Sequence, residues 1–177
     1  MITLITGNPD KLTELRRILP PELTLAHKAL DVDEIQSLSM HEIIEHKLAQ
    51  AHAIVGGPVM VEDVSAELAS LNGLPGPFIK FFMKRLGNDA LYRLGAANDR
   101  VTITCSMGYY DGIKRIIVDG VMTGTVVAPR GENGFGFDAT IVPDGYTQTI
   151  AELSSDKKDA LSHRRKACDA MRKALSK

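Results

Sequence analysis

An alternation of strand-like and helix-like patterns over the first 63 residues restricts the fold more than any other feature. The run Ile2–Thr6 is typical of a buried strand, because both of its faces carry apolar or small residues. Strands and helices are then expected in turn at residues 2–6, 12–19, 22–30, 39–53 and 59–61. Pro20-Pro21 is expected to end the first helix, and a capping box of Ser39 and Glu42 to open the second. This order favours an α/β architecture in which helices cover a sheet.

The remainder of the chain is less regular. A Gly/Pro-rich turn and two short helices are expected in "NGLPGPFIKFFMKRLG" and "NDALYRLG". Between Val101 and Val127, β-rich runs separated by "YYDGIK" and "DGVMTG" predict long antiparallel strands joined by Asp-Gly turns. After a loop-rich segment, Ser154–Lys177 is predicted to form one basic helix with an apolar side of Leu161, Cys168, Met171 and Leu175.

The composition favours one cytoplasmic domain, residues 1–177, without a linker. A chain of 177 residues, 44% of them hydrophobic, is long enough to bury a sizeable core. Its formal net charge of −1 argues against general binding to nucleic acid polymers or to a membrane surface. No apolar run approaches the roughly 20 residues that span a bilayer, and the start "MITLITGN" lacks the basic segment of a signal peptide. Cys105 and Cys168 are expected to be free thiols in a reducing compartment.

The stretch "GNPDK" joins the first strand to the first helix. If Asn8 caps this helix, Pro9 occupies its first position, where the missing N–H costs nothing. The N–H groups at the helix start would face the carboxyl edge of the sheet, and Lys11 would add a charge suited to a phosphate. A capped helix with a solvated lysine explains the same residues equally well, so both interpretations stay open. The stretch is not a P-loop, since its glycine and lysine spacing differs.

Glu62 and Asp63 form an acidic pair at the expected end of the third strand. Carboxylates at a sheet edge can hold Mg²⁺ through their oxygens and leave coordination positions for water and phosphate. Taken alone, Asp63 is more simply explained as the cap of the next turn. Glu34, in the polar loop after the second strand, could contribute a further carboxylate.

Two further stretches carry groups suited to a nucleobase. In "GFGFD", the glycines would let an aromatic ring lie against a base while Asp138 accepts hydrogen bonds. Buried aromatic side chains that only anchor a loop would give the same sequence pattern. In "SHRRK", the charge cluster is usually a solvated helix face, yet it would also suit a triphosphate and the polar edge of a base. Ser162 and His163 are not expected to act as nucleophile and base, because neighbours in a helix point about 100° apart.

Taken together and in order, these stretches resemble the inosine triphosphate pyrophosphatase family, also called Ham1-like proteins. The resemblance rests on "TGNPDK", "VEDVS", "LNGLPGPFIKFF", "GFGFD" and "AELSSDKKDALSHRRKA", which run almost from end to end of the chain. It implies an elongated α/β domain with a central mixed β-sheet flanked by helices, and two lobes around a deep cleft. It also implies homodimers that use Mg²⁺ to hydrolyse the triphosphates of inosine, deoxyinosine and xanthosine (ITP, dITP and XTP) to monophosphate and pyrophosphate.

The resemblance also implies roles for individual residues. Asp63 is the expected general base and, with Glu34, an expected metal ligand; Lys11 completes the catalytic set. The substrate-binding residues implied by the motifs are Thr6, Gly7, Asn8, Lys11, Lys47, Ser65, Lys80, Phe135, Gly136, Phe137, Asp138, Lys158, Ser162, His163 and Arg164. Near the phosphates are expected Thr6, Asn8, Lys11, Lys47 and Lys80. The residues of "FGFD" are expected around the base, with Lys158, Ser162, His163 and Arg164 closing over it.

The implied reaction suits the residues. A triphosphate of about four negative charges needs several cations, which lysines and Mg²⁺ would provide in an otherwise neutral protein. His163 and Arg164 could donate hydrogen bonds to the 6-oxo group of inosine. The 6-amino group of adenine would leave such donors unpaired, at a cost of about 1–3 kcal/mol each.

Three positions depart from the family pattern and leave the order of substrate preference open. Phe137 lacks a polar ring edge, Ala139 replaces a proline, and Asp159 stands where asparagine is usual. Two alternatives to the main hypothesis remain. One is a Maf-like pyrophosphatase for pyrimidine or modified nucleotides. The other is a nucleotide sensor without catalysis, which the presence of Glu34, Asp63 and Lys11 argues against.

Overall fold

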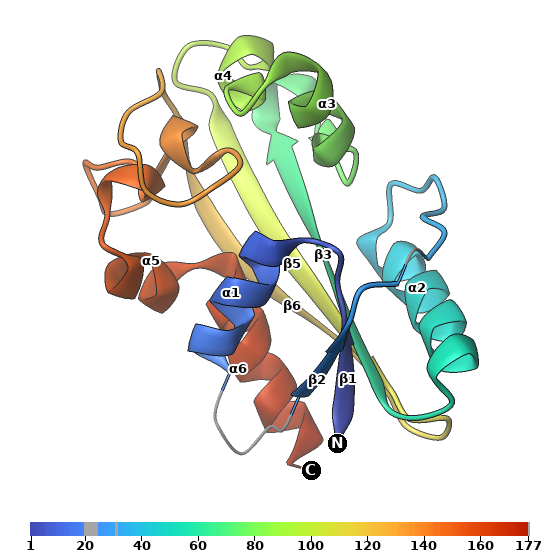
Figure 1. Cartoon of the computed structure of the whole chain (residues 1–177). Coiled ribbons are helices and arrows are strands. Elements are labelled where there is room, and N and C mark those ends of the chain that lie inside the picture. The colour runs from blue at the N-terminus through green and yellow to red at the C-terminus, as the bar shows by residue number, and fades with distance from the viewer. Residues whose placement is uncertain (20–24, 31, 177) are drawn as a thin grey trace. The chain divides into compact units, whose positions relative to one another are not determined.

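The computed structural model describes residues 1–19, 25–30 and 32–176 (Figure 1). The strands are β1 (Ile2–Ile5), β2 (Leu25–Lys28), β3 (Val59–Leu68), β4 (Pro75–Gly76), β5 (Arg100–Tyr110), β6 (Arg115–Val126) and β7 (Ile141–Pro143). The helices are α1 (Pro9–Ile18), α2 (Met40–Val55), α3 (Ile79–Leu86), α4 (Ala90–Leu94), α5 (Ser155–Leu161) and α6 (His163–Leu175). Short 3-10 turns are η1 (Ala69–Leu71), η2 (Asp138–Thr140) and η3 (Ile150–Glu152). The strands form one sheet in the order β2-β1-β3-β5-β6-β7, with β4 paired to β3, which confirms the predicted α/β class with a central mixed sheet.

The chain divides into two compact units. Unit 1 comprises Met1–Asp63, Cys105–Gly120 and Arg164–Lys177, and unit 2 comprises Val64–Thr104 and Val121–His163. The long strands β3, β5 and β6 change unit along their length, so each unit contains part of all three.

In unit 1, β1 lies between two parallel neighbours. Ile5 is in register with Lys28 of β2 and with Val61 of β3. Parallel strands need crossover connections, and α1 and α2 provide them. Figure 1 shows α2 on one side of these strands and α1 and α6 on the other. The predicted β-α-β-α-β order is therefore confirmed.

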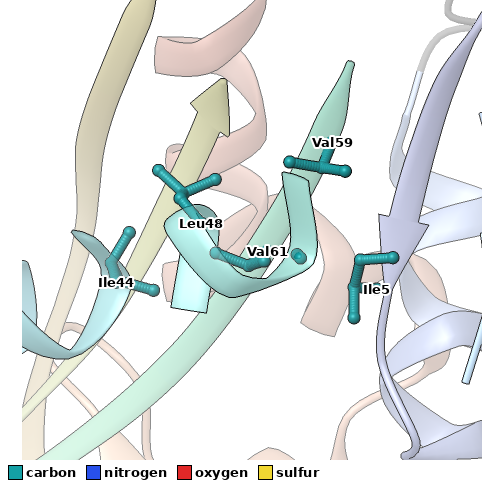
Figure 2. Packing of buried hydrophobic residues seen from close by; sticks show 6 residues of the cluster. Ile5, Ile44, Leu48, Val59 and Val61 are labelled. Carbon is teal, nitrogen blue, oxygen red and sulfur yellow. The ribbon is translucent and has the colours of Figure 1, made fainter. Parts of the chain in front are cut away.

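A hydrophobic cluster attaches α2 to the sheet of unit 1 (Figure 2). Its buried members are Ile5 of β1, Ile44, Leu48 and Ala51 of α2, and Val59 and Val61 of β3. The helical residues recur at intervals of three and four, and the strand residues at an interval of two, as expected when one helix face packs on one sheet face. Fully burying each large aliphatic side chain contributes about 1.5–3 kcal/mol.

The start of α1 agrees with its sequence signals. Asn8 Oδ1 accepts the N–H groups of Asp10 at 2.9 Å and of Lys11 at 3.2 Å. Pro9 is the first residue of the helix, where no intrahelical partner for its nitrogen is needed.

The start of α2 differs in one detail from the predicted capping box. Ser39 Oγ accepts the N–H of Glu42 at 3.3 Å, as predicted. The carboxylate of Glu42 does not return to the Ser39 nitrogen; it accepts the Ser37 hydroxyl at 2.6 Å, and the Ser39 N–H donates to Ser37 Oγ at 2.9 Å. The Ser37 hydroxyl thus links the Ser39 N–H to the Glu42 carboxylate, two groups that bond directly in a capping box.

In unit 2, β4 pairs antiparallel with β3, and β7 pairs antiparallel with β6. Arg100 of β5 forms two hydrogen bonds to Asp144, of 2.7 and 2.6 Å. Asp99, just before β5, accepts the N–H of Ser70 at 3.1 Å and so attaches η1 to the start of that strand.

β3 is longer than expected, which changes the position of the acidic pair. The strand continues to Leu68, so Glu62 and Asp63 lie inside it, and the expectation that they end it is wrong. The strand continues because its second part acquires a new partner, with Ala66 opposite Gly76 of β4. Since successive side chains in a strand point to opposite faces, Glu62 and Asp63 differ in most of their partners, although the Lys11 ammonium contacts both.

The second predicted Asp-Gly turn is also wrong. Asp111-Gly112 does form a turn, in which Asp111 Oδ1 accepts the N–H groups of Ile113 and Lys114, and Gly112 has φ 99°. Asp119-Gly120, by contrast, lies inside β6. Asp119 accepts the Ser106 hydroxyl at 2.5 Å, a contact with a residue of β5 that sequence periodicity does not reveal.

The predicted C-terminal helix is two helices. Ser162 is extended, with φ −66° and ψ 151°, and separates α5 from α6. Its N–H still donates to Lys158 O at 3.0 Å, which caps α5. The premise of a continuous helix at Ser162 and His163 is therefore wrong. Cys168 and Met171 on α6 are buried, as the predicted apolar side required.

Part of the expected second strand lies outside the described residues. These are residues 22–24, and β2 represents most of the rest of the predicted run. Pro20-Pro21, expected to end the first helix, and Lys177 also lie outside the described residues. The two short helices expected in the middle of the chain are present as α3 and α4. Within residues 1–19, 25–30 and 32–176, none of the helices combines the length and the apolar character that a membrane span requires.

Candidate active site

The carboxyl end of β1 is where the candidate site begins. β1 has β2 on one side and β3 on the other, and the chain leaves it through Thr6, Gly7 and Asn8 into α1. In open α/β sheets, ligands bind outside the carboxyl ends of strands at the point where neighbouring connections go to opposite faces. The turn is held by a hydrogen bond of 3.2 Å from the Asn8 N–H to Thr6 Oγ1.

Lys11, in the first turn of α1, contacts both acidic residues of β3. Its Nζ lies 2.8 Å from Glu62 Oε1 and 3.7 Å from Asp63 Oδ1. Burial alone would lower the pKa of the Lys11 ammonium, but the charges of Glu62 and Asp63 outweigh it and raise this pKa above its ordinary value. Lys11 is therefore a cation held inside unit 1, and not a solvated surface lysine.

Lys47, on α2, joins two carboxylates that are distant in sequence. Its Nζ lies 2.9 Å from Glu34 Oε1 and 2.5 Å from Asp63 Oδ2, and 8% of its side chain is exposed. Asp63 thus has Lys11 beside one carboxylate oxygen and Lys47 beside the other. The structure brings together four of the predicted phosphate and metal residues, Lys11, Glu34, Lys47 and Asp63.

Glu62 is fully buried in a cluster of charges on the opposite face of β3. Its Oε2 accepts the Arg164 Nε–H and the Cys105 thiol, both at 3.4 Å. Burial alone would raise the pKa of Glu62, but the positive charges of Lys11 and Arg164 hold it well below its ordinary value. Glu62 is therefore ionised at neutral pH and acts as the counter-ion of two cations.

Glu14 completes this cluster and was missed by sequence reasoning. It lies on α1, is buried, and its Oε2 contacts Nη1 of Arg164. The local pattern barely distinguishes it from an exposed helical glutamate, because its partner lies 150 positions away in the sequence. A faint signal existed in its position one turn after Lys11, on the same side of the helix.

Arg164 and the two cysteines are also buried in unit 1. The side chain of Arg164 is 3% exposed and neutralises Glu14 and Glu62. Burial raises the pKa of the Cys168 thiol to about 12 and that of Cys105 well above its ordinary value, so both thiols are neutral and poorly nucleophilic. They are the free, buried thiols that were expected.

The carboxylates of Glu34 and Asp63 have the chemistry that a hard divalent cation requires. No group of three or more histidine, cysteine or acidic side chains with metal-binding geometry occurs in the described part of the chain. The carboxylates of Glu34 and Asp63 do lie close together, because the Lys47 ammonium contacts one oxygen of each. Two carboxylate oxygens are a suitable protein contribution for Mg²⁺, which usually keeps several waters and binds substrate phosphates. The residues present therefore fit this metal.

In unit 2, the predicted base-binding residues form a compact arrangement around Asp138. Its Oδ2 accepts the Phe135 N–H at 2.9 Å and lies 2.6 Å from Lys158 Nζ. The same ammonium lies 4.7 Å from the centre of the Phe135 ring. Gly134 has φ 83°, and a Cβ there would lie 2.2 Å from Asp138 Oδ2, so this loop conformation requires glycine.

The other predicted residues of unit 2 are placed as follows. Phe137 and His163 are buried, Gly136 has φ 65°, and Lys80 is exposed on α3. Ser65 is buried on β3 and donates to Glu67 Oε1 at 2.9 Å. Ser162 is buried between α5 and α6. Ser65 is thus engaged within its own strand, whereas Lys80 is open to solvent.

The fold and these side chains define an α/β protein with carboxylates and lysines gathered at the carboxyl end of a parallel strand. The chain belongs to the Ham1 family, because the sequence model of this family matches residues 2–174. The resemblance inferred from the sequence motifs is therefore confirmed.

Named relatives and solved structures agree with this family. The inosine triphosphate pyrophosphatase of Schizosaccharomyces pombe is 37% identical over 178 residues, covering 98% of this chain and 94% of the relative. That of Yarrowia lipolytica is 40% identical over 182 residues, covering 99% and 95%. The Staphylococcus aureus Ham1 protein superposes with a TM-score of 0.84 at 25% identity, covering 99% of this chain and 98% of that one. A nucleoside-triphosphatase (dITP/XTP pyrophosphatase) from Mycobacterium abscessus gives a TM-score of 0.72 at 27% identity, covering 97% and 98%.

Proposed function

We propose that this protein hydrolyses the nucleoside triphosphates ITP, dITP and XTP to the monophosphate and pyrophosphate, which removes deaminated purines from the nucleotide pool. The observation that carries the proposal is the position of Asp63 between Lys11 and Lys47, with Glu34 on the second lysine. Relatives named inosine triphosphate pyrophosphatase, 37% and 40% identical over nearly the whole chain, support the same substrate class.

Lys11 and Lys47 bind the phosphates in this proposal. Both ammonium groups contact carboxylates at present, so phosphate oxygens would replace or join anionic partners that the lysines already have. The Thr6–Asn8 turn contributes polar groups at the start of α1, where the helix dipole favours an anion. Lys80 of unit 2, exposed on α3, adds a further cation.

Asp63 is the proposed general base. It takes a proton from a water molecule, whose oxygen attacks the α-phosphorus while pyrophosphate leaves. Its side chain is 22% exposed, so water can reach it, whereas the neighbouring Glu62 is fully buried and holds Lys11 in place. Mg²⁺ is the proposed cofactor; Glu34 and Asp63 would hold it, and when bound it would stabilise the charge that develops on the phosphate oxygens.

Residues of unit 2 recognise the base in this proposal. Phe135 and Phe137 provide aromatic faces, and Asp138 accepts hydrogen bonds from ring N–H groups. His163 donates to the 6-oxo group that distinguishes inosine and xanthosine from adenosine. Ser65, Gly136, Lys158 and Ser162 retain the binding roles implied by the sequence motifs, and the ion pair of Lys158 with Asp138 supports a joint role for these two residues. The motifs imply a binding role for Arg164 as well, but its guanidinium, in unit 1, is engaged by Glu14 and Glu62, so we assign it the role of holding these carboxylates.

Identification of the reaction products tests the proposal. Purified protein is incubated with ITP and Mg²⁺, and the nucleotides and phosphates are separated by ion-exchange chromatography. Inosine monophosphate and pyrophosphate are expected in equal amounts. Release of orthophosphate would refute the reaction type, faster hydrolysis of UTP or methylated nucleotides would favour a Maf-like activity, and tight binding without turnover would favour a sensor.

Asp63→Asn tests the role of the base. The amide cannot take the proton, so turnover of ITP is expected to fall by about 10²–10⁴-fold while nucleotide binding persists. Asp156→Asn makes the same chemical change at an exposed position in the first turn of α5 and should leave turnover close to the wild-type value. Equal turnover in the two variants would remove Asp63 from the mechanism.

We also propose a homodimer and a cytoplasmic location. The neutral, buried thiols of Cys105 and Cys168 support a reducing compartment. The dimer rests on the resemblance to the family. Light scattering after gel filtration should give twice the chain mass of 19.3 kDa, and a mass of one chain would exclude the dimer.

A further inference from the structure

The loop that carries Glu34 is attached to α2 at two points. The Asp33 N–H donates to Gln50 Oε1 at 3.0 Å, and Gln50 Nε2 donates back to Asp33 O at 3.5 Å. One side-chain amide therefore binds both backbone groups of the residue before Glu34. Nearer the end of the loop, the Ser37 hydroxyl donates to Glu42 Oε2 at 2.6 Å.

The α2 residues that contact this loop lie close together on the helix, with His46 beside them. Glu42, His46 and Gln50 follow one another at intervals of four, and Lys47 lies three positions before Gln50. His46 Nε2 contacts the Gln50 amide nitrogen, so the imidazole accepts from one N–H of the amide and Asp33 O from the other. This arrangement orients Gln50 Oε1 toward the Asp33 N–H.

The same helix also carries the cation that Glu34 contacts. Glu34 Oε1 lies 2.9 Å from Lys47 Nζ, while 32% of the Glu34 side chain is exposed. An exposed residue on an irregular loop has many conformations, and holding its carboxylate in one place costs conformational entropy. Attaching the preceding backbone to α2 lowers that cost, because loop and lysine then move as one element.

We propose that Gln50 is a positioning residue that holds the Asp33 backbone and thereby keeps the Glu34 carboxylate beside Lys47 and Asp63, where a divalent metal would be bound. This inference rests on the proposed function, specifically on Glu34 as a metal ligand. Gln50 acts through Glu34, as residues that bind metal ligands commonly orient them and tune their affinity.

Two substitutions of Gln50 and one control test this role. Gln50→Met removes both hydrogen bonds to Asp33 and keeps a side chain of similar length and helix propensity. Gln50→Glu keeps an oxygen that can accept the Asp33 N–H. Ala49→Met places the same methionine at the neighbouring, exposed position of α2 and leaves the amide intact.

The readouts are Mn²⁺ binding, followed by the electron paramagnetic resonance signal of the free ion, and hydrogen exchange of the Asp33 amide. Gln50→Met should weaken Mn²⁺ binding by about tenfold, the lower end of the effect of such residues, and speed exchange at Asp33. Gln50→Glu should restore slow exchange and most of the affinity, and Ala49→Met should match the wild type. With ITP, Gln50→Met should raise the Mg²⁺ concentration for half-maximal rate more than it lowers the rate at saturating Mg²⁺.

Glu34→Gln separates this inference from the proposed function. If Glu34→Gln weakens Mn²⁺ binding and Gln50→Met does not, the positioning role is wrong and the metal proposal stands. If Glu34→Gln leaves Mn²⁺ binding unchanged, the metal role of Glu34 fails and the positioning role is overturned with it. Equal acceleration of Asp33 exchange in Gln50→Met and Ala49→Met would indicate general loosening of α2 and would likewise overturn the proposal.

Discussion

At the scale of single residues, Glu62 and Asp63 show how strand geometry separates two identical chemical groups. Glu62 contacts Lys11 and the buried Arg164, whereas Asp63 contacts Lys47 and, at a longer distance, Lys11, and remains partly exposed. The buried carboxylate is committed to neutralising its neighbours. The exposed carboxylate is the one that water and phosphate can approach, which is why the proposed mechanism uses Asp63.

Lys11→Ala should damage activity more than stability. It removes a proposed phosphate ligand, so kcat/KM for ITP should fall by about 10²-fold, as the loss of a charge-assisted contact predicts. Arg164 still pairs with Glu62, so the free energy of unfolding should fall by only about 1–3 kcal/mol. Denaturant unfolding and steady-state kinetics measure the two effects, with Lys84→Ala on α3 as the control. A large loss of stability with normal kcat/KM would show that "GNPDK" is a structural turn without a role in phosphate binding.

The buried charge cluster predicts a stability that falls in acid. The folded-state pKa of Glu62 lies below its ordinary value of 4.5, so its ionisation stabilises the fold above about pH 4.5. This contribution is lost progressively as the pH falls below that value toward the folded-state pKa. Urea unfolding between pH 7 and pH 3 should show a steeper decline for the wild type than for Glu62→Gln, although the variant is less stable by about 3–5 kcal/mol at neutral pH. Parallel declines would assign the acid sensitivity to other groups.

At the scale of elements, structural features that depend on residues within one turn were predicted well, and features that depend on distant partners were not. The cap at Asn8 and the position of Pro9 depend on residues three or fewer positions apart, and both are present. The length of β3 depends on β4, and the strand that contains Asp119-Gly120 has its Ser106 partner on β5. Helix breaks at positions such as Ser162 are equally hard to predict, because serine is tolerated in helices and at their ends.

The packing of α2 on the sheet requires a glycine on β5. A Cβ on Gly108 would lie 2.4 Å from Cγ2 of Ile44 and 2.8 Å from Cδ1 of Leu48, both fully buried. Gly108→Ala should therefore lower the free energy of unfolding by about 1–3 kcal/mol, the usual cost of overpacking. Thermal and urea unfolding measure this, with Gly57→Ala, whose Cβ would meet nothing within 4 Å, as the neutral control. Equal stability of the two variants would show that α2 can shift at little cost.

At the scale of the whole molecule, the candidate residues fall into two chemically different sets. Unit 1 contains the lysines and carboxylates suited to phosphates and a metal, namely Lys11, Glu34, Lys47 and Asp63. Unit 2 contains the aromatic and polar groups suited to a base, such as Phe135, Asp138 and His163. All the proposed substrates share their triphosphate, and each carries a base with a 6-oxo group, which ATP lacks.

This division predicts different kinetic signatures for the two sets. Lys47→Met in unit 1 should lower kcat/KM for ITP, dITP and XTP by similar factors, because it removes a contact common to all three. His163→Ala in unit 2 should lower the preference for ITP over ATP by about tenfold, since it removes a hydrogen bond that only the 6-oxo base can accept. Hydrolysis rates of each variant on ITP, dITP, XTP and ATP, measured side by side, test both expectations. A change of preference in Lys47→Met, or none in His163→Ala, would contradict the division.

By itself, the sequence determined the α/β class, the starts of α1 and α2, the family and the candidate residues around "GNPDK", "VEDVS" and "GFGFD", because these depend on short-range periodicity, caps and ordered motifs. Only the tertiary structure decided which of two adjacent carboxylates is buried, that Glu14 pairs with Arg164, and that Gln50 holds the backbone beside Glu34. Such contacts join residues far apart in the sequence, and their chemistry depends on burial and distance. Neither quantity is present in a linear pattern of residues.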